Sequence, residues 1–91
     1  MTIAEAKWAF DNGVMVSLEI DPIKQTRAFY KYICELGYRR QNDGKVYLFA
    51  TCFDRFANSV TRTTVSDVMF ARKEDMERCH RELGTQNTQV L

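Results

Sequence analysis

Two hydrophobic patterns follow each other between residues 14 and 36. Over residues 14–20, apolar side chains occupy every second position, which is typical of a strand with one buried face. Apolar side chains then recur at helical spacing, with charged ones on the opposite side. Asp21-Pro22 favours the start of a helix and Gly37 favours its end. The pattern therefore predicts a strand over residues 14–20 and a helix over residues 22–36.

The first residues predict another helix. Thr2 and Glu5 have the spacing of a capping box, and Asn12-Gly13 is a typical helix stop, so this helix is expected over about residues 2–11. At helical spacing Trp8 points away from the apolar stripe. Exposed tryptophans are common at protein interfaces, but a neighbouring loop or strand can equally cover this one. The apolar stripe itself consists of Ile3, Ala6 and Phe10.

A hairpin is predicted after Gly37. Residues 38–41 form a short strand, Asn42-Asp43-Gly44 has the composition of a turn, and residues 45–53 form a strand that is apolar on both faces. Such a strand is expected inside a sheet, with other elements over both faces. If Asp43 and Gly44 are the two central turn residues, Arg40 pairs with Tyr47 and Tyr38 pairs with Phe49.

The last third of the sequence alternates less clearly. A loop or single helical turn is expected over residues 54–59, and a threonine-rich edge strand over residues 60–65. Ser66-Asp67 is expected to bend this strand before residues 68–70 resume it. A final helix is predicted over residues 72–83, closed by Gly84 and followed by a frayed tail over residues 85–91. Its narrow apolar stripe consists of Met76, Cys79 and Leu83.

This order of elements is helix, strand, helix, three antiparallel strands and helix. It predicts an α+β fold of the two-layer α/β sandwich type, in a single domain over residues 1–91. The sheet is expected to be mainly antiparallel, with three or four strands and the helices on one face.

Composition restricts the class of protein. Hydrophobic residues make up 45% of the chain, which is enough for a single core. Thirteen basic and twelve acidic residues give a net charge of +1, which supplies no electrostatic argument for nucleic acid or membrane. No apolar run is long enough to span a membrane and no leader pattern is present, so a cytoplasmic location is expected. The cysteines have neither disulfide nor zinc spacing and are expected in the core: Cys34, Cys52 and Cys79.

No motif for catalysis, cofactor binding or metal binding is found. His80 is the only histidine and has no second ligand at helical spacing, so a half-buried side chain with a hydrogen bond to the backbone is expected. The glycines all have turn or helix-stop roles, which leaves no phosphate-binding loop. Carboxylates near strand ends could meet to hold a metal for a small nuclease, but no local motif supports such a pair. These carboxylates are Glu19, Asp21, Asp43, Asp54 and Asp67.

Aromatic and arginine side chains on the hairpin are the most informative group. In the expected register, Arg39 lies on one face of the sheet and the other members of the group share the opposite face: Tyr38, Arg40, Tyr47, Phe49 and Phe53. Packing under a helix explains them, but an exposed face of this composition could bind a protein or stack the bases of a single-stranded nucleic acid. Together with Trp8 and Arg62, three hairpin residues form the candidate partner-binding set: Trp8, Tyr38, Arg40, Tyr47 and Arg62.

The function expected from the sequence is that of a stand-alone, non-enzymatic protein-binding module, such as an inhibitor, adaptor or regulatory subunit. Small inhibitors encoded by phages and mobile elements share this size and this lack of catalytic motifs. The alternative is a nucleic-acid-binding module that uses the aromatic and basic sheet face. Self-association as a homodimer is also expected, through either the edge strand over residues 60–65 or the face that carries Trp8.

Overall fold

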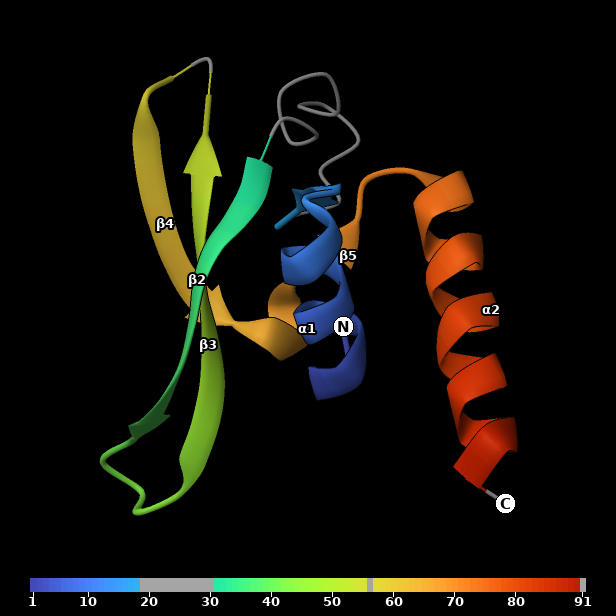
Figure 1. Ribbon diagram of the computed structural model, residues 1–91. Coiled ribbons are helices and arrows are strands. Elements are labelled where there is room, and N and C mark those ends of the chain that lie inside the picture. Colours follow the sequence, from blue (N-terminus) through green and yellow to red (C-terminus); the bar gives the residue numbers. More distant parts are fainter. Residues whose placement is uncertain (19–30, 56, 91) are drawn as a thin grey trace.

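The computed structural model describes residues 1–18, 31–55 and 57–90. Two helices and five strands are arranged as an α+β fold (Figure 1). In chain order the elements are α1 (Ile3–Asn12), β1 (Met15–Ser17), β2 (Lys31–Arg40), β3 (Val46–Asp54), β4 (Ser59–Thr64), the 3-10 turn η1 (Val65–Asp67), β5 (Met69–Phe70) and α2 (Lys73–Val90).

The five strands form one antiparallel sheet in the order β4-β3-β2-β1-β5. Both helices lie on the same side of this sheet, with α2 beyond α1 (Figure 1). The core lies between the sheet and α1, where small α1 side chains allow a close approach to the strands. Its buried members are Ala6, Trp8, Ala9, Val16, Ile33, Leu48, Ala50, Cys52, Val65, Val68 and Cys79.

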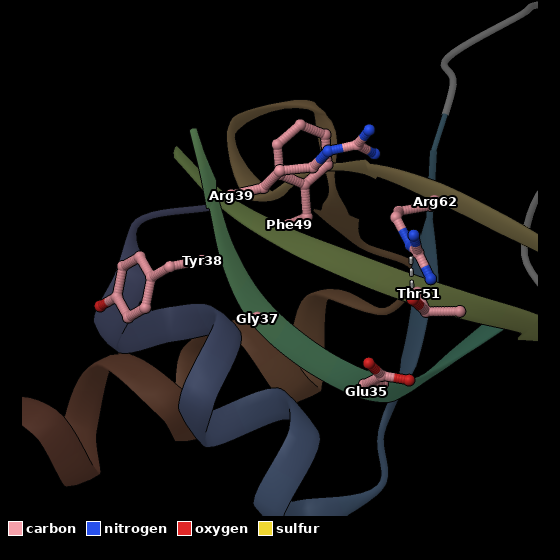
Figure 2. Close-up of a pocket in the computed structure, with 7 residues that line it drawn as sticks. All are labelled: Glu35, Gly37, Tyr38, Arg39, Phe49, Thr51 and Arg62. Carbon is pink, nitrogen blue, oxygen red and sulfur yellow. Dashed lines mark hydrogen bonds between the residues drawn. The ribbon is translucent and has the colours of Figure 1, made fainter. Parts of the chain in front are cut away.

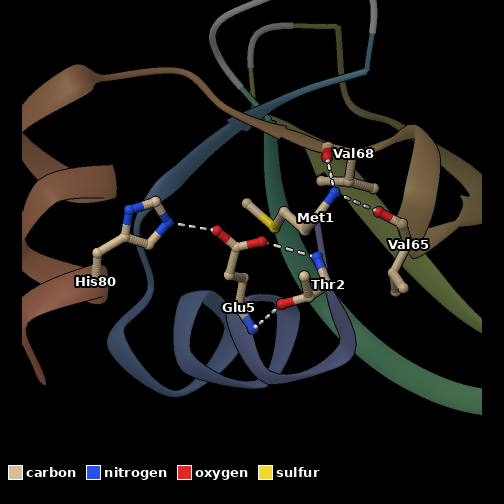
Figure 3. A network of polar contacts seen from close by, with 6 residues as sticks. All are labelled: Met1, Thr2, Glu5, Val65, Val68 and His80. Atoms are coloured by element: carbon tan, nitrogen blue, oxygen red, sulfur yellow. Dashed lines mark hydrogen bonds and ion pairs between the residues drawn. The ribbon is translucent and has the colours of Figure 1, made fainter. Parts of the chain in front are cut away.

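The predicted first helix is confirmed, but its predicted apolar stripe is wrong: Ile3 and Phe10 are 45% and 41% exposed, and the buried residues are Ala6, Trp8 and Ala9. The Thr2 hydroxyl accepts a hydrogen bond from the Glu5 backbone N–H at 3.1 Å, and the Glu5 carboxylate accepts one from the Thr2 N–H at 2.8 Å. Gly13 ends the helix in the left-handed conformation, with φ of 62°. The Met1 amino group donates to the carbonyl oxygens of Val65 and Val68, which ties the start of α1 to η1 (Figure 3).

The last helix begins where the sequence predicted but does not end there. Cys79 is fully buried, and Met76 and Leu83 are partly buried, so the predicted apolar stripe is confirmed. The helix continues through Gly84 to Val90, so the predicted stop at Gly84 is wrong. A single glycine costs a helix only about 1 kcal/mol, which the flanking helix formers can offset.

The predicted helix over residues 22–36 is wrong over its second half. Residues 31–36 belong to strand β2. The rest of the predicted helix and the last two residues of the strand predicted over residues 14–20 lie outside the described residues. The cause is a register shift between Ile33 and Glu35, a bulge in β2. It lets Ile33 and Leu36 both face the core although they are three positions apart. A bulged strand thus reproduces the apolar spacing of a helix.

The hairpin is confirmed, but its register differs by one residue from the prediction. Arg39 pairs with Tyr47, and Tyr38 pairs with Leu48. The Gly44 N–H donates to the Gln41 carbonyl at 2.9 Å, and φ of Gly44 is 82°. These features define a three-residue loop with a left-handed glycine, not the two-residue loop that the sequence predicted. The extra loop residue moves Tyr38 and Arg40 to the opposite face from Tyr47 and Phe49.

The remaining differences concern the sheet. The sheet has five strands where three or four were expected, and the order of elements has no described helix between β1 and β2. Strand β4 is an edge strand, as predicted. The strand predicted to follow it does not resume the same pairing, because η1 carries the chain to the opposite edge, where β5 pairs with β1. Strand β3 lies inside the sheet, as expected. Elements were expected over both of its faces, but the described helices lie over only one of them.

Neither helix in the described ranges has the length and apolar character that a membrane crossing requires.

Truncation of Ile33 tests the placement of β2. Ile33 is 6% exposed and packs in the core, so Ile33→Ala is expected to lower the free energy of unfolding by about 2–5 kcal/mol. Val60→Thr is the control, because Val60 is 63% exposed and the substitution keeps a β-branched side chain. It should change the free energy of unfolding by less than about 0.5 kcal/mol in urea titrations. Equal effects of the two substitutions would contradict this core.

Candidate functional site

The face of the sheet that points away from α1 carries the candidate site. Strands β2, β3 and β4 contribute alternate side chains to this face, and the described helices lie on the other one. We call it the outer face. Its side chains include Glu35 and Arg39 from β2, Tyr47, Phe49 and Thr51 from β3, and Val60, Arg62 and Thr64 from β4.

Three strands place these residues in cross-strand rows. Glu35, Thr51 and Arg62 are successive neighbours in one row. The next row places Gly37 beside Phe49, and the row after it places Arg39 beside Tyr47. Directly opposed side chains in antiparallel strands lie about 5 Å apart, so each row can contact a ligand as one unit.

A shallow hollow of about 170 Å³ lies in the middle of the outer face. Figure 2 shows the side chains of Arg39, Phe49 and Arg62 on one side of the sheet, with the Tyr38 ring directed away from them. Because Gly37 has no side chain, the space beside the Phe49 ring stays open. A Cβ atom at Gly37 would meet no other atom within 4 Å. The hollow is bordered by Glu35, Gly37, Tyr38, Arg39, Phe49, Thr51 and Arg62.

Hydrogen bonds orient two of the polar groups at this surface. The Arg62 Nε donates to the Thr51 hydroxyl at 3.4 Å, which holds the guanidinium along the sheet. The Tyr47 hydroxyl donates to the Asp43 carboxylate at 3.2 Å. This hydrogen bond and the negative charge of Asp43 raise the pKa of Tyr47, so the phenol stays protonated and neutral.

The predicted candidate residues are divided by the structure. Tyr47, 38% exposed, and Arg62 share the outer face, and both are accessible there. Tyr38, 63% exposed, and Arg40 lie on the opposite face, and Arg40 donates to the Gly44 carbonyl at 2.7 Å. The shared face that the sequence predicted for Tyr38, Arg40 and Tyr47 is therefore wrong, because of the hairpin register.

Trp8 is 7% exposed and belongs to the core. Its indole Nε1 donates to Glu82 at 3.3 Å, the Arg78 guanidinium lies 4.9 Å from the ring centroid, and Phe70 packs against it edge-on. Helix α2 therefore covers the side of α1 that the sequence left open. Trp8 is therefore not an exposed contact residue. The prediction that the face carrying Trp8 forms a dimer surface is wrong, because α2 covers Trp8.

Sequence reasoning missed the part played by Gly37 and Arg39. Gly37 was assigned to a helix end, and Arg39 to the other face. The available signal was the turn: Asn42-Asp43-Gly44 also fits a three-residue loop with glycine in the left-handed position. In that register Arg39 joins Tyr47 and Phe49, and Gly37 falls beside Phe49.

A second polar cluster joins the two helices. The His80 Nε2 lies 2.6 Å from the Glu5 carboxylate, whose other oxygen accepts the Thr2 N–H (Figure 3). Partial burial raises the pKa of Glu5, but the Thr2 hydrogen bonds and His80 outweigh this effect, and the net pKa is lowered. Both groups are engaged in joining α1 to α2. His80 is more exposed than the sequence predicted, and its hydrogen-bond partner is the Glu5 carboxylate where a backbone group was expected.

Burial affects two of the three cysteines. Burial raises the pKa of Cys52 to about 11, and burial followed by the charges of Glu5 and Glu82 raises the pKa of Cys79. Neither buried thiol is a ready nucleophile at neutral pH. Cys34 is exposed, contrary to its predicted core position. Within the described ranges, His, Cys, Asp and Glu side chains do not gather in groups that could hold a metal ion.

Comparison of the chain with protein-family models, curated proteins and solved structures found no match.

Acid titration tests the contact between the helices. Because the pKa of Glu5 is lowered in the folded protein, its carboxylate stabilises the fold above the unfolded pKa, and this stabilisation is lost as the pH falls through the folded pKa. Glu5→Gln keeps an acceptor for the Thr2 N–H and removes the charge. The variant is expected to unfold at a lower temperature than the wild type at pH 7, with the difference disappearing between about pH 5 and pH 3. A constant difference across this range would contradict the assignment.

Proposed function

We propose that this protein is a non-enzymatic protein-binding module, and that the outer face of its sheet is the binding surface. The observation that carries this proposal is the hollow beside Phe49, which Gly37 keeps open on a face that the described helices do not cover. An inhibitor, adaptor or regulatory subunit is the type of protein that this surface would serve.

The composition of the outer face resembles that of a protein interface. Aromatic and arginine side chains dominate binding energy at interfaces, and here Phe49 and Tyr47 lie beside Arg39 and Arg62. The hollow, at about 170 Å³, is smaller than the roughly 300–1,000 Å³ of typical small-molecule sites. It is therefore suited to one inserted side chain at the centre of a larger contact.

Single-stranded nucleic acid is the second candidate partner. The specific observation in its favour is that Phe49, Arg39 and Arg62 border the same hollow, so a base could stack on the ring while the arginines hold phosphates. Glu35 borders the same hollow, and the chain has a net charge of only +1. Both features weaken the attraction to a polyanion and place this candidate second.

The proposal extends to compartment and assembly. The three cysteines are free thiols and Cys34 is exposed, which is typical of proteins in a reducing compartment and supports a cytoplasmic location. Self-association would use the exposed edge of β4, because the alternative surface at Trp8 is covered by α2.

Substitution of Gly37 separates binding from folding. Gly37→Val would place a β-branched side chain in the hollow, inside a strand, at a position where its Cβ atom meets no other atom within 4 Å. The free energy of unfolding should rise by about 0.5–1 kcal/mol, since glycine weakens strand interiors. Capture of a protein partner from nuclease-treated lysate should nevertheless fall by about tenfold or more.

Two further variants complete this experiment. Phe49→Ala should also lose the partner, while Tyr38→Ala should retain it, because Tyr38 is an exposed aromatic residue on the opposite face. A partner that binds Gly37→Val and Phe49→Ala as strongly as the wild type would exclude the outer face. Capture that disappears on nuclease treatment would favour the nucleic-acid candidate.

A further inference from the structure

Strand β4 forms a regular, accessible edge of the sheet. All six of its residues pair with β3, from Ser59 opposite Asp54 to Thr64 opposite Phe49, without a register shift. In the described sheet β3 is its only neighbour, so the backbone groups on its other side have no partner strand. The residues over 59–62 are exposed, and the whole strand has the sequence Ser-Val-Thr-Arg-Thr-Thr.

This edge carries one charged residue, Arg62, but otherwise lacks the features that usually prevent strand addition. Natural edge strands are often protected by proline, lysine, a bulge or very short length. Strand β4 has no proline or lysine, and its threonines and valine have high strand propensity. The opposite edge, β5, is only two residues long and leads directly into α2. Of the two edges, β4 is therefore the one that can accept another strand.

We propose that β4 binds an extended acidic segment of a partner protein as an additional strand of the sheet. This inference rests on the proposed function and specifies how the partner is held. Main-chain hydrogen bonds to the free edge supply affinity, and side chains that alternate between the two faces supply specificity. The side chains on the outer face continue the surface around the hollow.

The charge of the segment follows from Arg62. This residue lies in the middle of β4 on the outer face, and β4 has no acidic residue to neutralise it. The Cβ atom of a residue opposite Arg62 on an added strand would lie about 5 Å from that of Arg62. The Arg62 guanidinium, which donates to Thr51 on β3, would turn toward the added strand to meet a carboxylate there. Glu35 lies on β2, three strand spacings or about 14 Å from that position. This exceeds the screening length of about 8 Å at physiological salt, so Glu35 does not repel an acidic residue there.

The same charge argument ranks the alternative occupants. A second copy of the chain would place β4 against β4, and neither strand would offer a carboxylate to Arg62. A nucleic acid would stack on Phe49 and use Arg39 as well as Arg62, whereas an added strand needs only the edge beside Arg62. Arg39 therefore distinguishes binding along the β4 edge from binding across the outer face.

A charge-reversal experiment, with one substitution in the protein and two peptides of opposite charge, tests the proposal. The probes are two short synthetic peptides, one of alternating valine and aspartate and one of alternating valine and lysine. The wild type should bind the aspartate peptide more tightly, by about five- to tenfold, and Arg62→Glu should reverse this preference. Arg39→Glu is the matched control on β2 and should leave the preference unchanged. Amide hydrogen exchange in residues 59–64 should slow when the aspartate peptide is bound.

Each other outcome overturns the inference. An equal affinity of the wild type and Arg62→Glu for the aspartate peptide would remove the role of Arg62. Binding without protection of residues 59–64, or loss of binding in Arg39→Glu, would place the contact on the outer face and not on the edge. Binding of oligothymidylate with dependence on both arginines would indicate nucleic acid, and protection that grows with protein concentration alone would indicate a second copy. If edge binding fails while Gly37→Val still abolishes partner capture, the proposed function stands without strand addition.

Discussion

The register of the β2–β3 hairpin determines which side chains reach the outer face. It is set by the loop Asn42-Asp43-Gly44, in which Gly44 adopts a positive φ and its N–H closes the turn on Gln41. The Asp43 carboxylate reinforces the loop by accepting the Lys45 N–H at 2.9 Å. Side chains alternate along a strand, so a loop longer or shorter by one residue would shift the pairing of β2 with β3 by one position. Each β2 side chain would then lie on the same face as a different set of β3 side chains. The hollow beside Phe49 exists only in the observed register.

The sequence predicted the parts of the fold that local chemistry controls. The capping box at Thr2 and Glu5, the stop at Gly13 and the stripe on α2 each depend on neighbouring residues, and all are confirmed. The helix predicted through residue 36 failed because the bulge in β2 places Ile33 and Leu36 on one face. Periodicity cannot distinguish that arrangement from a helix, since the pairing with β3 that decides it is not local.

The candidate site was less predictable than the fold for the same reason. Tyr47 and Arg62 could be selected by residue type, but their neighbours depend on register and strand order. Trp8 was placed away from the predicted buried stripe of α1, but it is buried and Ile3 and Phe10 of that stripe are exposed, because α2, more than sixty residues later in the chain, covers Trp8. Gly37 carries no chemical signal of its own. Its importance lies in the side chain that it lacks beside Phe49, which only the paired strands reveal.

Cross-strand nuclear Overhauser effects in the hairpin test the central claim most directly. The structure predicts backbone contacts that pair Gly37 with Phe49 and Arg39 with Tyr47, which place both aromatic rings and the open position on the outer face. Contacts that pair Tyr38 with Phe49 and Arg40 with Tyr47 would restore the two-residue loop. In that case Gly37 would no longer lie beside Phe49, and the surface on which the proposed function rests would not exist.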